Sequence, residues 1–295
     1  MTRLGTNGGK VVSFAGMKQR HPGRIAGKYL RSLEKYCKRI PGSFTIEDIH
    51  DLRVDYKRLR AFIRLCKEAP RTGNLQMPDP LREVYKAAGS VRDHQLFLAK
   101  ITLFAKVQYA LPQFTRCLQQ QLFRAKEFLV KKIEKVEWPR VCKSIEEELP
   151  AALHDSAIRQ FVNRKVAAIH ILQLAAEREE DLHDVRKNVK DLLHGARIFD
   201  HDWNVPFPFP AWKNEKPIND MAERLGDFND ECITLSFLEP ECCDKIPPEE
   251  RNNIDTWRSM QLQQVETDKK RLLQDIHQIR LSTHNSLIKD AAKGL

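Results

Sequence analysis

Apolar and polar residues follow each other at steps of three and four along most of the chain, which is the spacing of helices with one buried face. The two-residue alternation typical of half-buried strands is scarce. The pattern therefore predicts an all-α protein. The segments that carry it are 24–40, 45–67, 79–107, 142–200, 218–238 and 250–290, with further helix between Pro112 and Pro139.

Turn and capping residues separate these helices. We expect Pro41-Gly42 to end the first helix, while Thr45-x-x-Asp48 has the spacing of a capping box that opens the second. Asp79-Pro80 places an N-cap before a proline at the first helical position. The segments 203–217 and 240–248 are rich in proline and predict loops. The first of these loops also carries aromatic residues, which we expect to cover one end of a bundle, with docking of a protein partner as the alternative.

A short motif occurs twice. Residues 50–64 read HDLRVDYKRLRAFIR and residues 183–197 read HDVRKNVKDLLHGAR, at an offset of 133. Further along, Arg92-Asp93 corresponds to Asn229-Asp230 at an offset of 137. Two motifs in the same order and at nearly the same offset predict a duplicated helical module. We expect a flexible basic arm at 1–21, a first half at 22–140 and a second half at 141–295.

Each copy of the motif combines an apolar seam with a row of basic side chains. The rows are shifted from the seams by one residue, which is about 100° around a helix. Cations in such a row repel one another unless an anion bridges them, so the rows predict an anion-binding groove between helices. The seams are Ile49, Leu52, Tyr56, Leu59 and Ile63, and Leu182, Val185, Val189, Leu192 and Ala196. The rows are His50, Arg53, Lys57, Arg60 and Arg64, and His183, Arg186, Lys190 and Arg197.

The charge of the chain is concentrated at its N-terminal end. The formal net charge is +10, and residues 1–64 hold 15 Lys and Arg against 5 Asp and Glu, which leaves 35 of each in the remainder. This balance favours a polyanionic partner. A third basic row lies on the first helix, where Glu34 is the only acidic residue; its members are Arg24, Lys28, Arg31, Lys35 and Lys38.

The duplicated H-x-x-R-x-x-x-K/R-x-x-R pattern, followed by an R-D helix, resembles the CHAD domain (conserved histidine α-helical domain). The resemblance extends from about His21 to the C-terminal helix. The second copy departs from the family pattern at Asp191, Leu193 and Asn229, so its row is expected to bind more weakly. The matching residues are His50, Arg53, Lys57, Arg58, Arg60, Arg92 and Asp93, then His183, Arg186, Lys190, Leu225, Gly226 and Asp230.

The resemblance implies an all-α fold of two pseudo-symmetric antiparallel helical bundles around a central basic groove. It further implies non-catalytic binding of inorganic polyphosphate and association with polyphosphate granules in the cytoplasm. No catalytic residue, metal or cofactor is expected, and sulfate or phosphate ions are expected to occupy the groove in crystals. The expected binding residues are Arg24, Lys28, Arg31, Lys35, His50, Arg53, Lys57, Arg58, Arg60, Arg64, His183, Arg186, Lys187, Lys190 and Arg197.

The residue types in the rows agree with such a ligand. Polyphosphate has no bases to read, and the rows contain almost no interleaved aromatic residues of the kind that stack on bases. Two alternatives stay open. His50-Asp51 and His183-Asp184 suggest an HD-type metal-dependent phosphohydrolase, although a basic row beside each histidine would repel a divalent cation. The other alternative is a helical protein that binds nucleic acid.

Apolar runs and cysteines bear on the compartment. No run of about 18 apolar residues occurs, so no membrane-spanning helix is expected. The stretch 11–17 is interrupted by Ser and Gly, which is not the pattern of a secretory signal. The seven cysteines are scattered without C-x-x-C spacing, so we expect reduced thiols packed in the core of a cytoplasmic protein.

Overall fold

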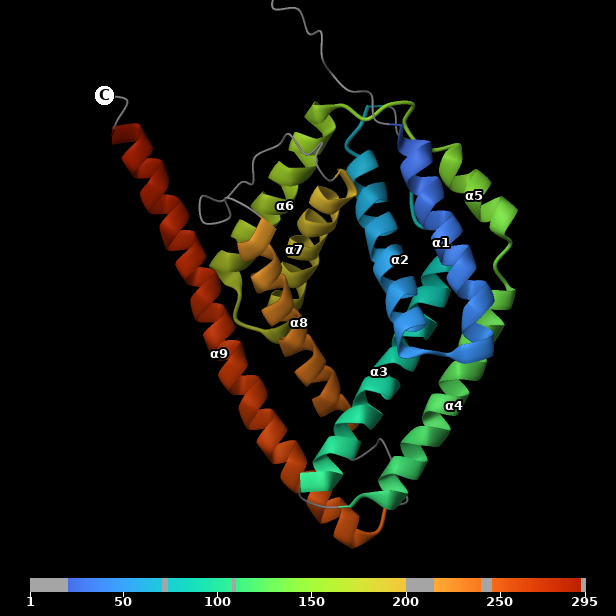
Figure 1. The fold of residues 1–295 in the computed structure, drawn as a ribbon. Helices are drawn as coiled ribbons and strands as arrows, with labels where there is room; N and C mark the ends of the chain where they lie inside the picture. Colours follow the sequence, from blue (N-terminus) through green and yellow to red (C-terminus); the bar gives the residue numbers. More distant parts are fainter. Residues whose placement is uncertain (1–20, 71–73, 108–109, 200–214, 240–245, 293–295) are drawn as a thin grey trace, which may run out of the picture.

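A computed structural model describes residues 21–70, 74–107, 110–199, 215–239 and 246–292. Within these ranges the chain forms nine α-helices and no strand, which confirms the prediction of an all-α protein (Figure 1). The helices are α1 (Pro22–Ser43), α2 (Ile46–Cys66), α3 (Asp79–Val107), α4 (Pro112–Glu134), α5 (Trp138–Glu146), α6 (Asp155–Ala175), α7 (Glu179–Phe199), α8 (Glu215–Phe237) and α9 (Pro248–Ala292).

The helices form two arms that meet at one end, like a V (Figure 1). One arm holds α1, α2, α4 and α5, and the other holds α6 to α9, while α3 runs from the first arm to the base. Helix α2 packs against α1 and α3, and α7 packs against α6 and α8. Helices α2 and α7 also pack against each other, so the two copies of the sequence motif meet between the arms.

The apolar seams of both motif helices are buried, as their spacing predicts. Ile49 and Leu59 of α2 and Val189 of α7 have no exposed surface. The other seam residues are buried as well, and all of them except Ala196 belong to one core cluster that spans both arms. Because each seam points inward, the basic row one residue along each helix is left at the edge of the α2–α7 contact.

A second apolar cluster fixes the base of the V. The ring of Phe97 on α3 stacks on Trp257 of α9, with 5.5 Å between their centroids. The buried carboxylate of Glu250, in the first turn of α9, accepts hydrogen bonds of 3.0–3.1 Å from the backbone N–H groups of Gln113 and Phe114. These N–H groups begin α4 and have no partner within their own helix, so α9 caps α4 across the base.

Several helix ends differ from the sequence prediction. Helix α1 continues through Pro41 and ends at Ser43. Phe44 terminates it by adopting a left-handed conformation (φ 49°) and donating its N–H to the Ile40 carbonyl at 2.9 Å. The proline removes one backbone hydrogen bond close to a helix end, where the loss is small. The capping contact of α2 forms as predicted: the Thr45 side chain accepts from the Asp48 N–H at 3.1 Å.

Two longer predictions are also revised. The segment 142–200 is not continuous helix but contains the end of α5 and all of α6 and α7, with breaks at 147–154 and 176–178. Helix α8 begins at Glu215, within the predicted loop, because Pro217 is tolerated in a first turn. The rest of that loop, most of the loop at 240–248 and all of the basic arm except His21 lie outside the described residues.

The cysteines depart from the expectation of seven reduced thiols. Cys117 of α4 is disulfide-bonded, whereas Cys37, Cys66, Cys142 and Cys232 are free. Spacing along the sequence does not reveal which cysteines meet in space, which is why the prediction was wrong. In the part of the chain that the structure describes, no helix is both long and apolar enough to cross a membrane.

Candidate anion-binding site

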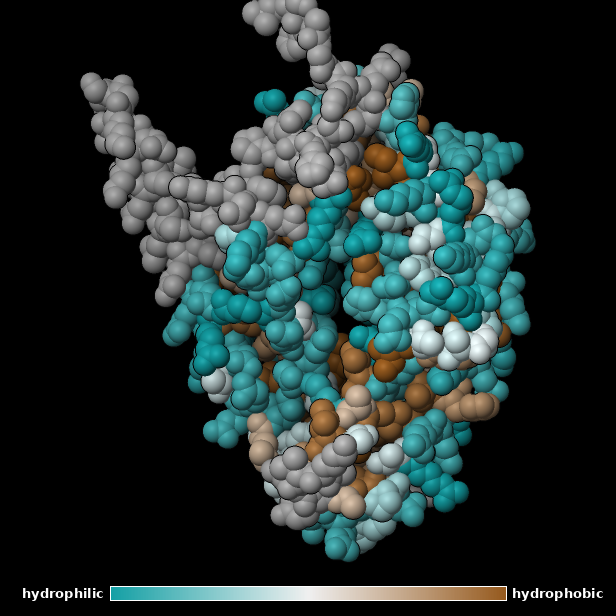
Figure 2. Space-filling model, in the orientation of Figure 1, coloured by the Kyte–Doolittle hydropathy of each residue, from teal (hydrophilic) through white to brown (hydrophobic). Residues whose placement is uncertain are grey.

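The contact between α2 and α7 gathers five cations from the predicted rows. The Lys57 ammonium lies within electrostatic reach of Arg53 and Arg60 on its own helix and of Arg186 and Lys190 on α7. All five side chains are half-buried. In the orientation of Figure 1, the surface is hollowed between α7–α8 on one side and α2 on the other (Figure 2). We call these five residues the central cations.

Crowding and burial change the protonation of this group. Burial is the main cause that lowers the pKa of Lys57 to about 7, and the four neighbouring cations lower it further. Burial also lowers the pKa of Arg186 and of Lys190, where Arg186 itself adds to the effect. A buried cation without a partner is unfavourable, so binding an anion would stabilise this group.

None of the central cations has an ion-pair partner among the described residues. The Nε atoms of Arg60 and Arg186 are buried and have no hydrogen-bond partner there. Buried polar atoms usually do have partners, so these two are donors that a bound anion would satisfy.

The other predicted arginines of α2 are already engaged. Arg58 pairs with Asp55 at 3.1 Å. Arg64 pairs at 2.5 Å with Asp191 of α7, a carboxylate that is only 1% exposed and also holds Lys165 of α6 at 2.7 Å. Asp191 therefore ties α2, α6 and α7 together, and its charge offsets that of Arg64.

Two groups of Tyr85 on helix α3 contact Arg53. The guanidinium Nη1 donates to the Tyr85 carbonyl at 3.4 Å, and its carbon lies 4.8 Å from the centre of the Tyr85 ring. A Cβ on Gly89, one turn further along α3, would overlap the Arg53 guanidinium, so glycine provides the room for it. On the other arm, Arg186 lies over Gly226 of α8, where a Cβ would make ordinary contact at 3.8 Å.

Sequence reasoning missed Tyr85. Its ring stacks on Tyr56 with 4.2 Å between centroids and 14° between planes. The Arg60 guanidinium carbon lies 5.9 Å from the Tyr85 centroid and 6.0 Å from that of Tyr56. The available signal was the position of Tyr85 four residues before Gly89, on the same face of α3.

The two motif histidines lie at the ends of their rows and are exposed. Burial is the main cause that lowers the pKa of both histidines below the ordinary value. The positive charge of Arg92 lowers the pKa of His50 further, and that of Lys187 does the same for His183. Nδ1 of His183 lies 3.1 Å from Oδ1 of Asn229 on α8. Both imidazoles are therefore mainly neutral above pH 6.5 and become cationic only in acid.

A third histidine, His194 of α7, was not predicted. It is 7% exposed, and neither ring nitrogen has a hydrogen-bond partner in the described structure. Burial lowers its pKa to about 3, and Lys190 and Arg58 lower it further. His194 is therefore a neutral group beneath the central cations.

Carboxylates lie at the other side of the site, where α3 approaches α8. Burial raises the pKa of Asp93, the nearby charge of Asp230 raises it further, and Arg53 lowers it. Arg92 lies beside them and donates from Nη1 to the Ile46 carbonyl at 3.3 Å. These acids limit the positive surface on this side.

The remaining predicted residues lie around the central group. Lys187 pairs with Asp184 at 2.8 Å, and Arg197 donates to Oδ1 of Asn219 at 2.9 Å. On α1 the row Arg24, Lys28, Arg31 and Lys35 is exposed. Arg31 acts electrostatically on Cys142 of α5, which places it on the side of α1 toward that helix.

The aspartates of the two His-Asp pairs contact other groups. Asp51 accepts a hydrogen bond from the Tyr36 hydroxyl at 3.3 Å, and Asp184 binds Lys187. The charges next to His50 are predominantly cationic, as described above. Within the described ranges no group of three or more His, Cys, Asp and Glu side chains is placed to hold a metal ion.

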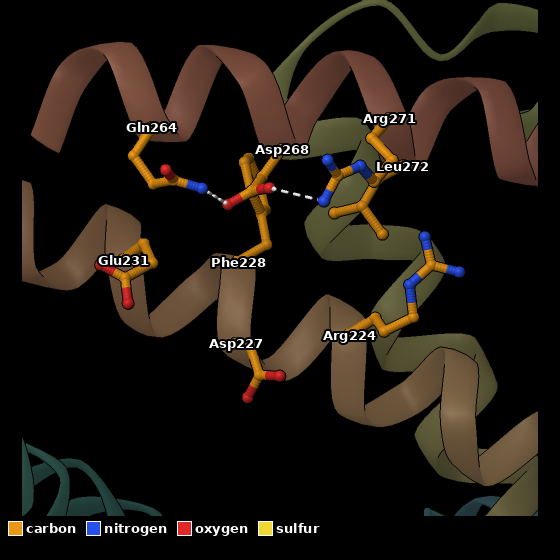
Figure 3. A pocket seen from close by; sticks show the side chains of 8 residues that line it. All are labelled: Arg224, Asp227, Phe228, Glu231, Gln264, Asp268, Arg271 and Leu272. Atoms are coloured by element: carbon orange, nitrogen blue, oxygen red, sulfur yellow. Dashed lines mark hydrogen bonds and ion pairs between the residues drawn. The ribbon is translucent and has the colours of Figure 1, made fainter.

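A separate pocket of about 380 Å³ lies between α8 and α9 (Figure 3). Asp268 sits between Gln264 and Arg271, and the charged residues that line the pocket are Arg224, Arg271, Asp227, Glu231 and Asp268. Since its acids outnumber its arginines, this pocket lacks the positive surplus of the α2–α7 site.

The fold and site define an all-α protein in which two copies of a basic motif meet face to face. A sequence model of the CHAD domain matches residues 24–239, and the chain belongs to the CHAD family. A comparison with curated proteins finds no match.

Two solved structures share the fold. The CHAD domain from the plant Ricinus communis has a TM-score of 0.61 at 16% identity, with 92% of this chain and 94% of that chain covered. PptA from Streptomyces chartreusis has a TM-score of 0.60 at 13% identity, with 87% and 99% covered.

Proposed function

We propose that this protein binds inorganic polyphosphate, without catalysing a reaction, in a basic groove between α2 and α7. The observation that supports the proposal is the set of central cations, which lie close together with no carboxylate of the described residues paired to any of them. A chain of phosphates laid between the two helices would neutralise both rows at once and accept from the buried Nε atoms of Arg60 and Arg186.

We also infer that the groove lies between two pseudo-symmetric bundles, with halves at 22–140 and 141–295. Under this inference α1 to α4 correspond to α6 to α9. The placement of Arg53 over Gly89 and of Arg186 over Gly226 supports it, because both pairs join equivalent positions. Helix α5 crosses the boundary between the two halves and packs on α1.

The groove residues divide into a centre and a periphery. The central cations form the contact of greatest charge density. His50, His183, Arg58, Arg64, Lys187 and Arg197, together with the α1 row, would extend the path of a long chain over the surface at lower affinity. Association with polyphosphate granules follows from such binding, since a granule presents many equivalent chains.

The proposal is tested by titrating labelled polyphosphate into the full chain at several salt concentrations. We expect affinity to fall steeply with salt, since binding releases counterions. A variant with Arg53, Lys57, Arg186 and Lys190 changed to Gln should lose most of its affinity.

The matched control removes four exposed cations of α4 and its C-terminal end, Arg116, Arg124, Lys131 and Lys135, in the same way. Equal losses in the two variants would show that general charge, not the groove, holds the ligand. Equal competition by single-stranded DNA would favour the nucleic-acid alternative, and phosphate release with Mn²⁺ would favour the hydrolase.

A further inference from the structure

The site contains two kinds of arginine on one helix. Arg58 and Arg64 are held by carboxylates, whereas Arg53 and Arg60 are held by the ring of Tyr85. A carboxylate fixes an arginine but cancels its charge. An aromatic face attracts a cation through its quadrupole and carries no net charge, so the arginine keeps its full charge for another ligand.

The Tyr85 ring is itself firmly placed. It stacks on Tyr56, which is 4% exposed and belongs to the apolar seam of α2. Its backbone carbonyl also receives the Arg53 Nη1 hydrogen bond. The ring and the carbonyl of one residue thus hold the same guanidinium from two directions.

Tyr85 also lies near the other motif helix. Arg186 of α7 lies within electrostatic reach of Tyr85 as well as of Arg53. The position equivalent to Tyr85 in the second half, at the offset of 137, is Ala222, which has no ring. Among the described residues, the aromatic contacts of the central cations therefore come from Tyr56 and Tyr85 of the first half.

We propose that Tyr85 is a positioning residue for polyanion binding, whose ring holds Arg53 and Arg60 against mutual repulsion while leaving their charges uncompensated. This inference rests on the proposed function. Without the ring, Arg53, Lys57 and Arg60 would spread into solvent to lower their repulsion, and a ligand would have to gather them again. That ordering would reduce affinity without removing any charge.

The test compares polyphosphate affinity in Tyr85→Leu and Tyr85→Phe at fixed salt. Tyr85→Leu should weaken binding about tenfold, because it removes two cation–π contacts in a partly desolvated site. Tyr85→Phe keeps the ring face and should bind within about twofold of the unchanged protein. Wild-type affinity in Tyr85→Leu, or an equal loss in both variants, would overturn the proposal.

Tyr36→Leu is the matched control. It removes another tyrosine that faces an arginine, since the Arg39 guanidinium carbon lies 5.3 Å from the Tyr36 centroid, but at the contact between α1 and α2 away from the central cations. Its affinity should be unchanged. A loss equal to that of Tyr85→Leu would assign the effect to general destabilisation and so count against the proposal.

A spectroscopic measurement tests the geometry even if Tyr85→Leu does not fold. Ring currents from Tyr85 should shift the Nε–H proton resonances of Arg53 and Arg60 upfield in the unchanged protein. Unshifted resonances would overturn the proposal. The double variant Arg53→Ala/Arg60→Ala separates the two hypotheses. If it binds normally, the groove fails; if it binds weakly while Tyr85→Leu binds normally, only the role of Tyr85 fails.

Discussion

The motif helices α2 and α7 share a histidine, an arginine and a lysine at the same spacing, but their surroundings differ. On α2, Arg53 rests on an aromatic ring and a backbone carbonyl. On α7, the residue after the motif lysine is Asp191, which ties down Arg64 and Lys165. Its equivalent on α2 is Arg58, a cation. The difference teaches that the nature of each partner, rather than the number of basic residues, decides how much charge a groove offers.

The largest expected effect comes from breaking the junction at Asp191. Asp191→Ala leaves Arg64 and the mostly buried Lys165 without their carboxylate, and should lower the free energy of unfolding by about 3 kcal/mol. Arg58→Ala, the equivalent change in the first half, should cost less than about 1 kcal/mol because its pair with Asp55 is partly exposed. Urea denaturation measures both, and equal losses would contradict the contrast between the helices.

The next effect separates unpaired from paired arginines in binding. Arg53→Ala should weaken polyphosphate binding about 30-fold, which corresponds to ~2 kcal/mol for a charged hydrogen bond. Arg186→Ala should weaken binding about tenfold, since no ring of the described residues stacks on this arginine and the nearby Asp230 offsets part of its charge. Arg58→Ala should change affinity less than threefold, as Asp55 already offsets its charge. Calorimetric titration distinguishes these values; a ranking with Arg58 first would reverse the interpretation.

The pH dependence sharpens the same comparison, because Lys57 has a pKa of about 7 and is the only central cation brought so low. Affinity for long-chain polyphosphate should fall about tenfold between pH 6 and 8, as the free protein loses the Lys57 proton. Lys57→Arg should flatten this dependence, whereas Lys190→Arg on α7 should retain it. An unchanged profile in Lys57→Arg would show that another group titrates.

Lys57 also links pH to stability in the absence of ligand. The ordinary pKa of 10.5 applies to the unfolded chain, so between about pH 7 and 10.5 the unfolded chain binds more protons than the folded one. The contribution of Lys57 to the free energy of unfolding therefore rises with pH across this window and is least favourable below pH 7. Thermal unfolding of the Lys57→Met variant should lose this rise.

The smallest effect is expected on α1. The double variant Lys28→Ala/Lys35→Ala removes two exposed cations outside the central group and should weaken binding less than about threefold at moderate salt. The same measurement at low salt should enlarge the loss, since exposed charges are then less screened. A loss as large as that of Arg53→Ala would place the main site on α1.

The helices, both buried seams and the duplicated basic rows could be predicted from the sequence, because each depends on periodicity within one helix. It could not show the state of each cation. Arg64 and Asp191 are 127 residues apart, and nothing local to either indicates that they pair. Tyr85 likewise lies in a helix whose sequence resembles ordinary core packing, and only the approach of α3 to α2 places its ring under Arg53. Periodicity identifies a face, whereas the partners of that face come from other helices.

The cap that Glu250 provides has a consequence for synthesis of the chain. Glu250 caps the N-terminus of α4, and Trp257 of α9 adds to the packing of the Phe97 ring, which also stacks on Phe237 of α8. Glu250 and Trp257 leave the ribosome more than 130 positions after α4 begins, since domains emerge N-terminal end first. We therefore expect the N-terminus of α4 to stay uncapped, and the base of the V to stay incomplete, until the start of α9 has been made. Closure of the base is for this reason expected to be a late step, because it depends on contacts between residues far apart in the sequence.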